Sequence, residues 1–183
     1  MTYLRIYTDD DAENTLVDTR DGEAIAVALG EIGVRYERWP LRPLPEDPSQ
    51  DAILAAYAAE VRRLQGEHGY QAVDVVRLTP EHPDREALRS KFLSEHRHSE
   101  DEVRFFVAGE GLFTLRENDR VHTVLCTEGD LISVPAGMRH WFDMGPSPRF
   151  IAIRLFTNPE GWVANFTGDS IADRFPRHEP VAA

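Results

Sequence analysis

Three histidines and one glutamate have the types and the spacing of a metal-binding group. His96 and His98 are two residues apart, so on a β-strand both imidazoles point to the same face. Glu102 follows four residues after His98 and shares that face if the strand is continuous. His140 stands at the start of another expected strand, beyond a Pro-Ala-Gly turn. We therefore predict one metal site with three imidazole nitrogens and one carboxylate oxygen.

The donor set limits the metals that fit. Imidazole nitrogens suit Fe, Ni, Cu and Zn, whereas a carboxylate oxygen disfavours the softest ions. Structural zinc sites are usually closed by thiolates, which this set lacks. Two positions of an octahedral ion would stay open for exogenous ligands, so the site is suited to catalysis. The other histidines lie in polar or turn-like stretches that favour surface or hydrogen-bonding roles: His68, His82, His122 and His178.

The front section, residues 1–90, mixes expected strands and helices. Ile25, Leu29 and Ile32 recur at the spacing of a helix, and Gly33 is suited to end it. Several prolines between residues 40 and 48 predict a loop. The expected strands are 4–7, 34–39 and 73–78, and the expected helices are 21–33, 49–69 and 83–91.

From about residue 93, short apolar runs alternate with turn residues. Runs of this kind are typical of a sandwich or barrel of antiparallel strands. The tail after Phe175 has little apolar surface to bury, and we expect it to be mobile. The turns are expected at 109–111, 117–119, 128–130, 135–137 and 145–148, between strands at 103–107, 112–115, 121–125, 131–134, 141–144 and 150–156.

Length and composition predict one globular domain over residues 1–183. The chain carries a net charge of −12 and is 42% hydrophobic, so it can bury a core, and its acidity argues against nucleic-acid binding. No apolar run approaches the ~20 residues that span a bilayer, and the start lacks a signal-peptide pattern. Cys126 alone excludes an internal disulfide. We expect a cytoplasmic monomer without membrane or nucleic-acid partners.

Two longer stretches resemble the two signature motifs of the cupin superfamily. The pattern H-x-H-x3-E-x6-G over residues 96–109 is similar to the first, and G-x5-P-x-G-x2-H over residues 129–140 is similar to the second. Ser90 and Met144 replace a glycine and an asparagine expected beside these motifs. The resemblance implies a mainly β fold, the cupin double-stranded β-helix, a jelly-roll-like barrel with the metal inside and a few helices mostly in the N-terminal half.

Within the cupins, the chain resembles the acireductone dioxygenase family. The resemblance is carried by EHRHSEDEVRFFV at 95–107, GDLISVPAG at 129–137, HWFD at 140–143 and GW at 161–162. It implies an enzyme of methionine salvage with one Fe(II) or Ni(II) per chain, which cleaves 1,2-dihydroxy-5-(methylthio)pent-1-en-3-one with dioxygen. The iron form would give formate and 4-methylthio-2-oxobutanoate. The nickel form would give formate, carbon monoxide and 3-methylthiopropanoate.

The charge of that substrate calls for a cation. Its reactive form is a dianion, and with Glu102 it outweighs the charge of a divalent metal. Arg104 follows Glu102 by two residues and shares its face, so we predict that its guanidinium stabilises the dianion. Arg154, inside an apolar strand, is a second candidate and needs a partner. Because Lys91 is the only lysine among 20 basic residues, we expect a cation in a pocket to be an arginine.

The methylthio tail and the ligands need further neighbours. Phe92, Phe142 and Trp162 are predicted to form an apolar slot for the tail. Glu95 and Asp101 flank the ligands and are predicted to contact imidazole N–H groups or to face solvent.

Other functions are compatible with these residues. The chain would be another cupin oxygenase, acting on a thiol or a flavonol, if the substrate differs. It would be a non-catalytic cupin if the pocket only binds a metal or small ligand, and a zinc-dependent isomerase if it needs no dioxygen. In each case we expect residues 91–166 to form the metal-binding barrel core, residues 1–90 to pack on it and residues 167–183 to form a tail.

Overall fold

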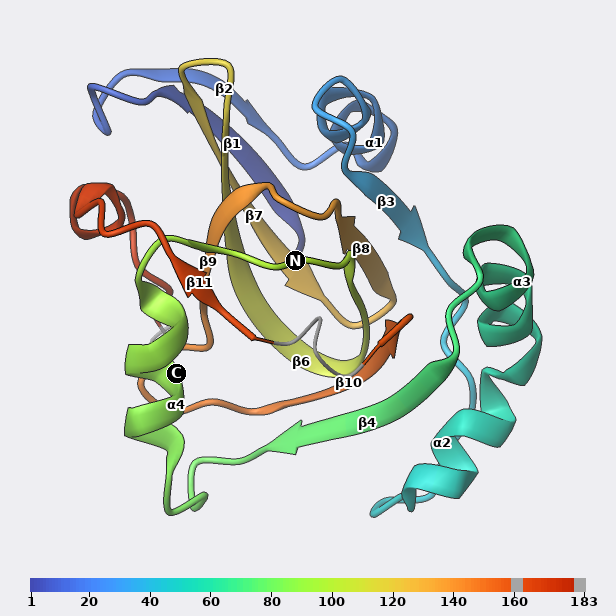
Figure 1. Ribbon diagram of the computed structural model, residues 1–183. Coiled ribbons are helices and arrows are strands. Elements are labelled where there is room, and N and C mark those ends of the chain that lie inside the picture. The colour runs from blue at the N-terminus through green and yellow to red at the C-terminus, as the bar shows by residue number, and fades with distance from the viewer. Residues whose placement is uncertain (159–162, 180–183) are drawn as a thin grey trace.

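The computed structural model describes residues 1–158 and 163–179 (Figure 1). The strands are β1 (Tyr3–Thr8), β2 (Thr15–Thr19), β3 (Arg35–Arg38), β4 (Ala72–Leu78), β5 (His96–Arg97), β6 (Glu102–Glu117), β7 (Arg120–Thr127), β8 (Asp130–Val134), β9 (Arg139–Asp143), β10 (Phe150–Phe156) and β11 (Asn165–Phe166). The helices are α1 (Gly22–Gly30), α2 (Gln50–Ala56), α3 (Ala58–His68), α4 (Arg85–Leu93) and the 3-10 helix η2 (Ile171–Arg174).

The strands form two antiparallel sheets that share the long strand β6. The first sheet has the order β11-β5-β9-β6-β7-β1-β2, and the second has β4-β10-β6-β8-β3. The N-terminal half of β6 pairs with β8 and β10, and its C-terminal half pairs with β7 and β9. Mainly β architecture with α1 to α4 in the first part of the chain is confirmed. Strands of the front section extend both barrel sheets.

The prediction of two strands at 103–107 and 112–115 with a turn between them is wrong. The structure has one strand, β6, that bends at Gly109 and Gly111. Gly109 has φ +75, and a Cβ there would overlap the carbonyl oxygen of Arg149. A Cβ at Gly111 would overlap the ring of Phe142. The glycines therefore allow neighbouring chain to approach a bent strand closely, and they do not reverse the chain.

Two helices of the front section, α1 and α2, begin at a side chain that caps the first turn. The Asp21 side chain accepts from the Ala24 N–H at 2.8 Å, and the Ser49 hydroxyl accepts from the Ala52 N–H at 3.2 Å. The single helix expected at 49–69 is two helices, because the backbone leaves the helical region at Tyr57. Strand β2 was not expected, since it is an exposed edge strand without an apolar face.

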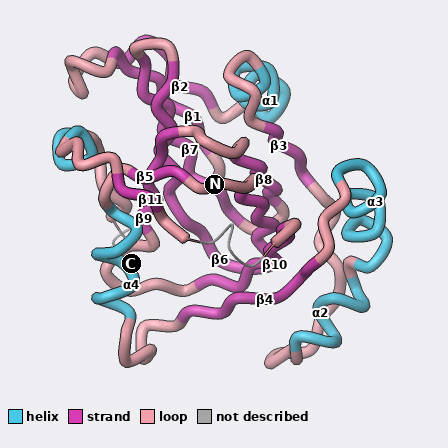
Figure 2. The backbone as a smooth tube through the Cα atoms, viewed as in Figure 1, coloured by secondary structure: helices cyan, strands magenta, loops and turns pink. Residues whose placement is uncertain are grey.

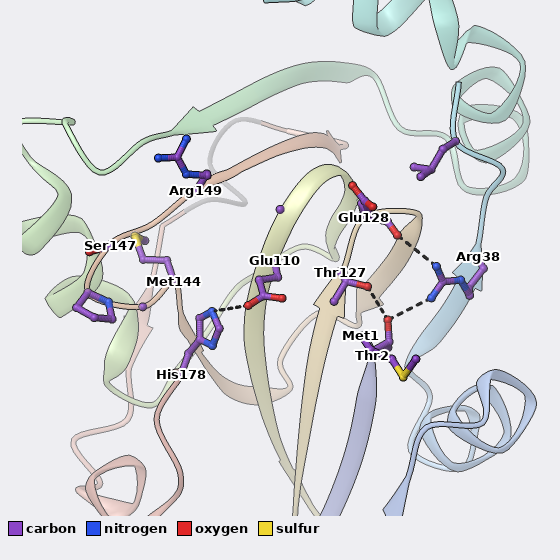
Figure 3. Close-up of a pocket in the computed structure, with 14 residues that line it drawn as sticks. Met1, Thr2, Arg38, Glu110, Thr127, Glu128, Met144, Ser147, Arg149 and His178 are labelled. Atoms are coloured by element: carbon purple, nitrogen blue, oxygen red, sulfur yellow. Dashed lines mark hydrogen bonds and ion pairs between the residues drawn. The ribbon is translucent and has the colours of Figure 1, made fainter. Parts of the chain in front are cut away.

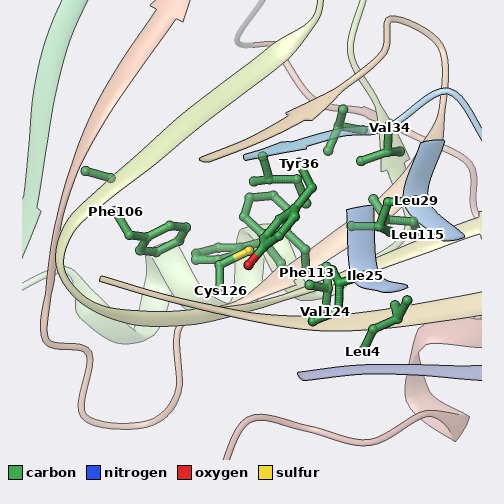
Figure 4. Packing of buried hydrophobic residues seen from close by; sticks show 14 of the residues in the cluster. Leu4, Ile25, Leu29, Val34, Tyr36, Phe106, Phe113, Leu115, Val124 and Cys126 are labelled. Carbon is green, nitrogen blue, oxygen red and sulfur yellow. The ribbon is translucent and has the colours of Figure 1, made fainter. Parts of the chain in front are cut away.

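Three apolar clusters hold these layers together. The first fills the barrel between the sheets and includes Cys126 (Figure 4). The second lies on the outer face of the second sheet, under α2 and α3. The third lies on the outer face of the first sheet, where Ile171 and Phe175 of the tail section pack on Tyr7 and Trp141. Part of the expected tail therefore covers the barrel.

Alternation along β6 decides which side chains face the interior. Val103 and Phe105 pack outward into the cluster under α2 and α3, whereas Phe106 faces the core between the sheets. Glu102 and Arg104 have the same parity as Phe106 and point inward. None of the described helices has the length and apolar character that crossing a membrane requires.

Candidate metal centre

The fold brings the four predicted ligands together at one end of the barrel. His96 of β5 lies directly opposite His140 of β9, and Figure 2 shows these strands next to α4. Glu102 begins β6. The expected continuous strand is absent, because β5 ends at Arg97 and His98 lies in the following loop. Even so, one ligand atom from each of the four side chains lies within 4.8 Å of all the others.

Backbone carbonyls fix the orientation of all three imidazoles. Nδ1 of His96 lies 2.7 Å from the Ser94 carbonyl oxygen, and Nδ1 of His140 lies 2.8 Å from that of Met138. Nδ1 of His98 lies 3.1 Å from the carbonyl oxygen of Val163. A carbonyl only accepts, so each Nδ1 must carry the proton. In the neutral rings each Nε2 then presents a lone pair.

These lone pairs face a carboxylate. Nε2 of His140 lies 2.8 Å and Nε2 of His98 lies 3.3 Å from the same Glu102 oxygen. Two acceptors at such a distance repel each other unless a cation lies between them. The donor chemistry therefore fits a divalent ion held by three nitrogens and one oxygen, as in the prediction.

Burial and charge set the protonation states of this group. Burial, together with the neighbouring His140, lowers the pKa of His96 to about 4. Burial alone would raise the pKa of Glu102, but the Arg104 guanidinium holds it well below its usual range. Near neutral pH the group thus offers a neutral imidazole at His96 and a carboxylate, which are the forms that bind metals.

A cavity of about 210 Å³ opens beside the ligands. It reaches His98 and Glu102, so an exogenous molecule in it would lie against the metal group. Its wall combines apolar side chains with several charges. The lining residues are Lys91, Phe92, His98, Asp101, Glu102, Val103, Arg104, Arg154 and Leu155.

Arg104 lies in the cavity wall as expected. Its guanidinium donates to the second Glu102 oxygen at 2.8 Å, and it stacks over the Phe142 ring with its carbon 4.7 Å from the ring centroid. The residue is only 8% exposed, and burial lowers its pKa. Nε of Arg104 is buried with no hydrogen-bond partner in the described part of the chain, so this donor is unsatisfied.

Arg154 lies next to Arg104 across the β6–β10 pair. It donates to both oxygens of Asp74 on β4, at 2.9 and 2.7 Å. The expected partner of Arg154 is therefore Asp74. This bidentate ion pair offsets the charge of a second guanidinium beside Arg104.

The predicted apolar residues have different positions. Phe92 lines the cavity, and its ring centroid lies 6.2 Å from that of His96. Phe142 is 1% exposed, belongs to the barrel core and lies behind Arg104, outside the cavity lining. Phe142 contacts the site only indirectly, through the Arg104 guanidinium that stacks on its ring. Trp162 falls outside the described residues.

Glu95 and Asp101 do not contact the ligand imidazoles, contrary to the first of the two roles expected for them. Glu95 is buried, which excludes the second, and accepts from the Thr167 hydroxyl at 2.7 Å and from Arg116 at 3.4 Å. Asp101 accepts from the Ala136 N–H at 3.0 Å and from the Tyr70 hydroxyl at 3.2 Å. Each carboxylate braces the backbone that carries the ligands.

A larger cavity of about 720 Å³ lies away from this group. Figure 3 shows that its polar side chains are turned toward each other, with His178 facing Glu110 and Arg38 facing Thr2. None of the four proposed ligands lines it. The smaller cavity is therefore the candidate active site, because it reaches the proposed ligands and Arg104, whereas the larger cavity does not.

Sequence reasoning missed two charged residues of the site. Lys91 lines the cavity, and Asp74 holds Arg154. Asp74 is an isolated acid in an apolar strand, and Arg154 is an isolated base in another. Pairing those two anomalies would have predicted that β4 and β10 are neighbours.

Comparisons with known proteins agree over nearly the whole chain. The sequence pattern of the ARD/ARD' family matches residues 3–164. The chain is 59% identical to the acireductone dioxygenase of Hahella chejuensis over 181 residues, covering 99% of this chain and 98% of the relative. It is 57% identical to that of Parvibaculum lavamentivorans over 180 residues, covering 98% of each.

A solved structure extends the likeness to three dimensions. It is the acireductone dioxygenase from Bacillus anthracis with a cadmium ion in its active centre. The two align with a TM-score of 0.79 and 33% identity, over 91% of this chain and 98% of that one. The chain therefore belongs to the acireductone dioxygenase family.

Proposed function

We propose that this protein is a metal-dependent dioxygenase that cleaves 1,2-dihydroxy-5-(methylthio)pent-1-en-3-one in methionine salvage. The observation that carries the proposal is the convergence of three oriented Nε2 atoms on Glu102, beside a cavity that contains Arg104. Membership of the family supports the substrate. His96, His98, Glu102 and His140 are the proposed ligands of one Fe(II) or Ni(II).

The bound metal would supply Lewis acidity and two exchangeable positions for exogenous ligands. The protein supplies the rest. The buried Arg104 guanidinium compensates negative charge on the enediolate and favours its deprotonated form. Arg104 stays protonated, so it acts through its charge and takes no proton.

The wall around the metal group suits the shape of this substrate. Phe92 and Leu155 provide apolar surface for a methylthio chain, and a direct contact of Phe142 or Trp162 with the chain stays a prediction. The carboxylates of Glu102 and Asp74 already hold the two arginines in place. The substrate's oxygens would thus face charged groups while its methylthio tail faces apolar side chains. This difference orients the substrate in the cavity.

The active unit is proposed to be one chain in the cytoplasm. All four proposed ligands and Arg104 come from the same chain, so no second copy is needed to complete the site. The lone Cys126 is buried and suits a reducing compartment. Size-exclusion chromatography with activity measured in each fraction tests the monomer.

The function is tested with apoprotein reconstituted with Fe(II) or Ni(II) and supplied with synthetic acireductone. The iron protein should consume dioxygen and release formate with 4-methylthio-2-oxobutanoate. The nickel protein should release formate, carbon monoxide and 3-methylthiopropanoate. Nickel protein that consumes substrate without releasing carbon monoxide contradicts the proposal.

The same assay separates the competing functions. A metal-binding cupin without catalysis would leave dioxygen consumption at the uncatalysed rate with either ion. An isomerase would convert substrate equally well under anaerobic conditions. An oxygenase for a thiol or flavonol would leave acireductone at its uncatalysed rate.

A further inference from the structure

Lys91 is the only lysine of the chain, and it lies in the lining of the active-site cavity. The composition predicts arginine as the cation of any pocket, and Arg104 and Arg154 meet that expectation. Lys91 adds a third cation from the last turn of α4, where its side chain is exposed to solvent. Its place at the solvent side of the cavity suggests a role before the substrate reaches the metal group.

The three cations of the cavity differ in their partners. Arg104 is paired with Glu102, and Arg154 with Asp74. In the described residues no carboxylate lies within ion-pair distance of the Lys91 ammonium, whose contact is the Phe92 ring, 5.5 Å from the nitrogen to the centroid. Of the three, Lys91 is therefore the one whose charge no carboxylate of the described residues offsets.

The lining holds two acids, Glu102, which pairs with Arg104, and Asp101, which is engaged elsewhere. Both Asp101 oxygens accept hydrogen bonds, one from the Ala136 N–H and one from the Tyr70 hydroxyl. These contacts hold Asp101 against the turn that precedes β9. An anion entering the cavity would thus meet a mobile ammonium before it meets the paired arginines.

An ion pair holds α4 against the barrel. Arg89 donates to both oxygens of the buried Asp143, at 2.8 and 3.0 Å. No described residue of α4 is fully buried, so this pair and the partly buried Leu88 and Phe92 dock the helix. The docking keeps Lys91 beside the cavity while its long side chain stays free to move.

We propose that Lys91 is a positioning residue that captures the anionic enediolate at the cavity mouth and delivers it to the metal group. This inference rests on the proposed function. The chain has a net charge of −12, which repels an anion at long range. An unpaired cation at the entrance reverses the local field and raises the rate of productive encounter.

Three variants test the proposal. Lys91→Gln removes the charge, Lys91→Arg keeps it, and Arg120→Gln removes one positive charge from the exposed first residue of β7. Each metal-loaded protein is assayed for dioxygen consumption with acireductone at about 20 mM and about 300 mM salt. Metal content and melting temperature are measured in parallel.

Lys91→Gln should raise KM about tenfold, change kcat less than about twofold and abolish most of the salt dependence of kcat/KM. Lys91→Arg should stay within about threefold of the unchanged protein, since it retains the charge. Arg120→Gln should match the unchanged protein in both constants. A structural role of Lys91 would instead lower metal content or melting temperature.

Chemical modification provides a second test, because Lys91 is the only lysine of the chain. N-hydroxysuccinimidyl acetate acetylates amines, so Lys91 and the terminal amine are its main targets. Acetylation should raise KM of the unchanged protein as much as Lys91→Gln does, and it should leave Lys91→Arg unaffected. Mass spectrometry of the peptide that contains residue 91 confirms the modification.

The outcomes separate the two proposals. If the unchanged protein turns over acireductone and Lys91→Gln has the same KM and salt dependence, the role of Lys91 is overturned and the function stands. If the unchanged, metal-loaded protein consumes no dioxygen, the function fails and the role of Lys91 fails with it. Loss of metal or of thermal stability in Lys91→Gln also overturns the positioning role.

Discussion

Two inward-facing carboxylates, Asp130 and Glu102, have opposite surroundings. Asp130, at the start of β8, is fully buried. It accepts from the Tyr36 hydroxyl at 2.8 Å, the Thr127 N–H at 2.8 Å, the Arg38 guanidinium at 3.0 Å and the Thr2 hydroxyl. Every partner is a donor, so the network is complete without a ligand.

Glu102 meets two acceptors and one donor. Nε2 of His140 and of His98 face one of its oxygens, while Arg104 donates to the other. In a barrel that buries several polar groups, this difference separates a candidate ligand site from a structural network. A buried network in which acceptors face one another needs a bound cation. A buried network in which every acceptor has a donor is complete and stabilises the fold.

The largest expected effect follows from removing a ligand of the incomplete network. His140→Ala should lose most of the bound metal and lower turnover by about 1,000-fold, because a three-donor site remains. His96→Ala and His98→Ala should behave alike. Elemental analysis of the purified proteins and dioxygen consumption measure both effects.

His122→Gln is the matched control, since His122 is also a buried histidine but has no place in the ligand group. It should keep its full metal content. Full metal content in any two of the three ligand variants would contradict the assignment of the site.

Arg104 is the one donor of the incomplete network, and its loss should act on turnover alone. Arg104→Ala should keep the metal and lower turnover about 100-fold. The deficit should shrink as pH rises, because solution then deprotonates the substrate without help. Arg104→Lys should recover part of the activity, since an ammonium lacks the forked geometry.

A pH–rate profile with a melting curve and a metal assay for each variant provides the measurement. Normal turnover of metal-loaded Arg104→Ala would refute the proposed charge compensation. A lower melting temperature with near-normal turnover would instead assign Arg104 to an ion pair of the barrel rim.

Weakening the complete network should affect stability and leave the metal in place. Asp130→Asn replaces an acceptor of charge-assisted bonds by an amide, and we expect a loss of about 2 kcal/mol of unfolding free energy. Asp18→Asn, which breaks the exposed ion pair with Arg5, should cost less than about 0.5 kcal/mol. Urea denaturation of both variants tests the contrast, which fails if Asp130→Asn loses metal at unchanged stability.

A smaller effect than that of Asp130→Asn concerns His122, a buried imidazole that belongs to neither network. Burial lowers its pKa to about 4, so between pH 6.5 and 4 the unfolded chain binds a proton that the folded chain does not. Stability therefore falls as pH falls. From pH 7 to pH 5.5 the unchanged protein should lose about 1 kcal/mol more than His122→Gln. Equal losses, measured by urea denaturation at both pH values, would place a compensating charge near His122.

The grouping of the four proposed ligands was predictable because it follows from spacing along the chain. Two histidines at i and i+2, with motif glycines and proline at fixed offsets, identify the four residues without any knowledge of pairing. Sequence reasoning placed His98 and Glu102 on one continuous strand, whereas a loop separates them. The four residues still lie together, because the loop after His98 returns Glu102 to the same interior.

What could not be predicted depends on contacts between distant residues. His122 was expected in a surface or hydrogen-bonding role, and it is buried, because its strand β7 lies between β6 and β1. Asp130 was counted as a turn residue, and only the pairing of β8 with β3 brings Tyr36 to it. Periodicity reports the face of an element and not its neighbours.

The membership of β6 in both sheets has a consequence for the order of folding. Its hairpin with β7, closed by Asn118 and Asp119 with positive φ, joins residues close in sequence and can form early. Pairing with β10, and of β10 with β4, must close much longer loops, which places this barrel among slow-folding, high-contact-order proteins. Since His96 meets His140 only after β5 docks on β9, the proposed metal group would assemble only after the barrel has closed.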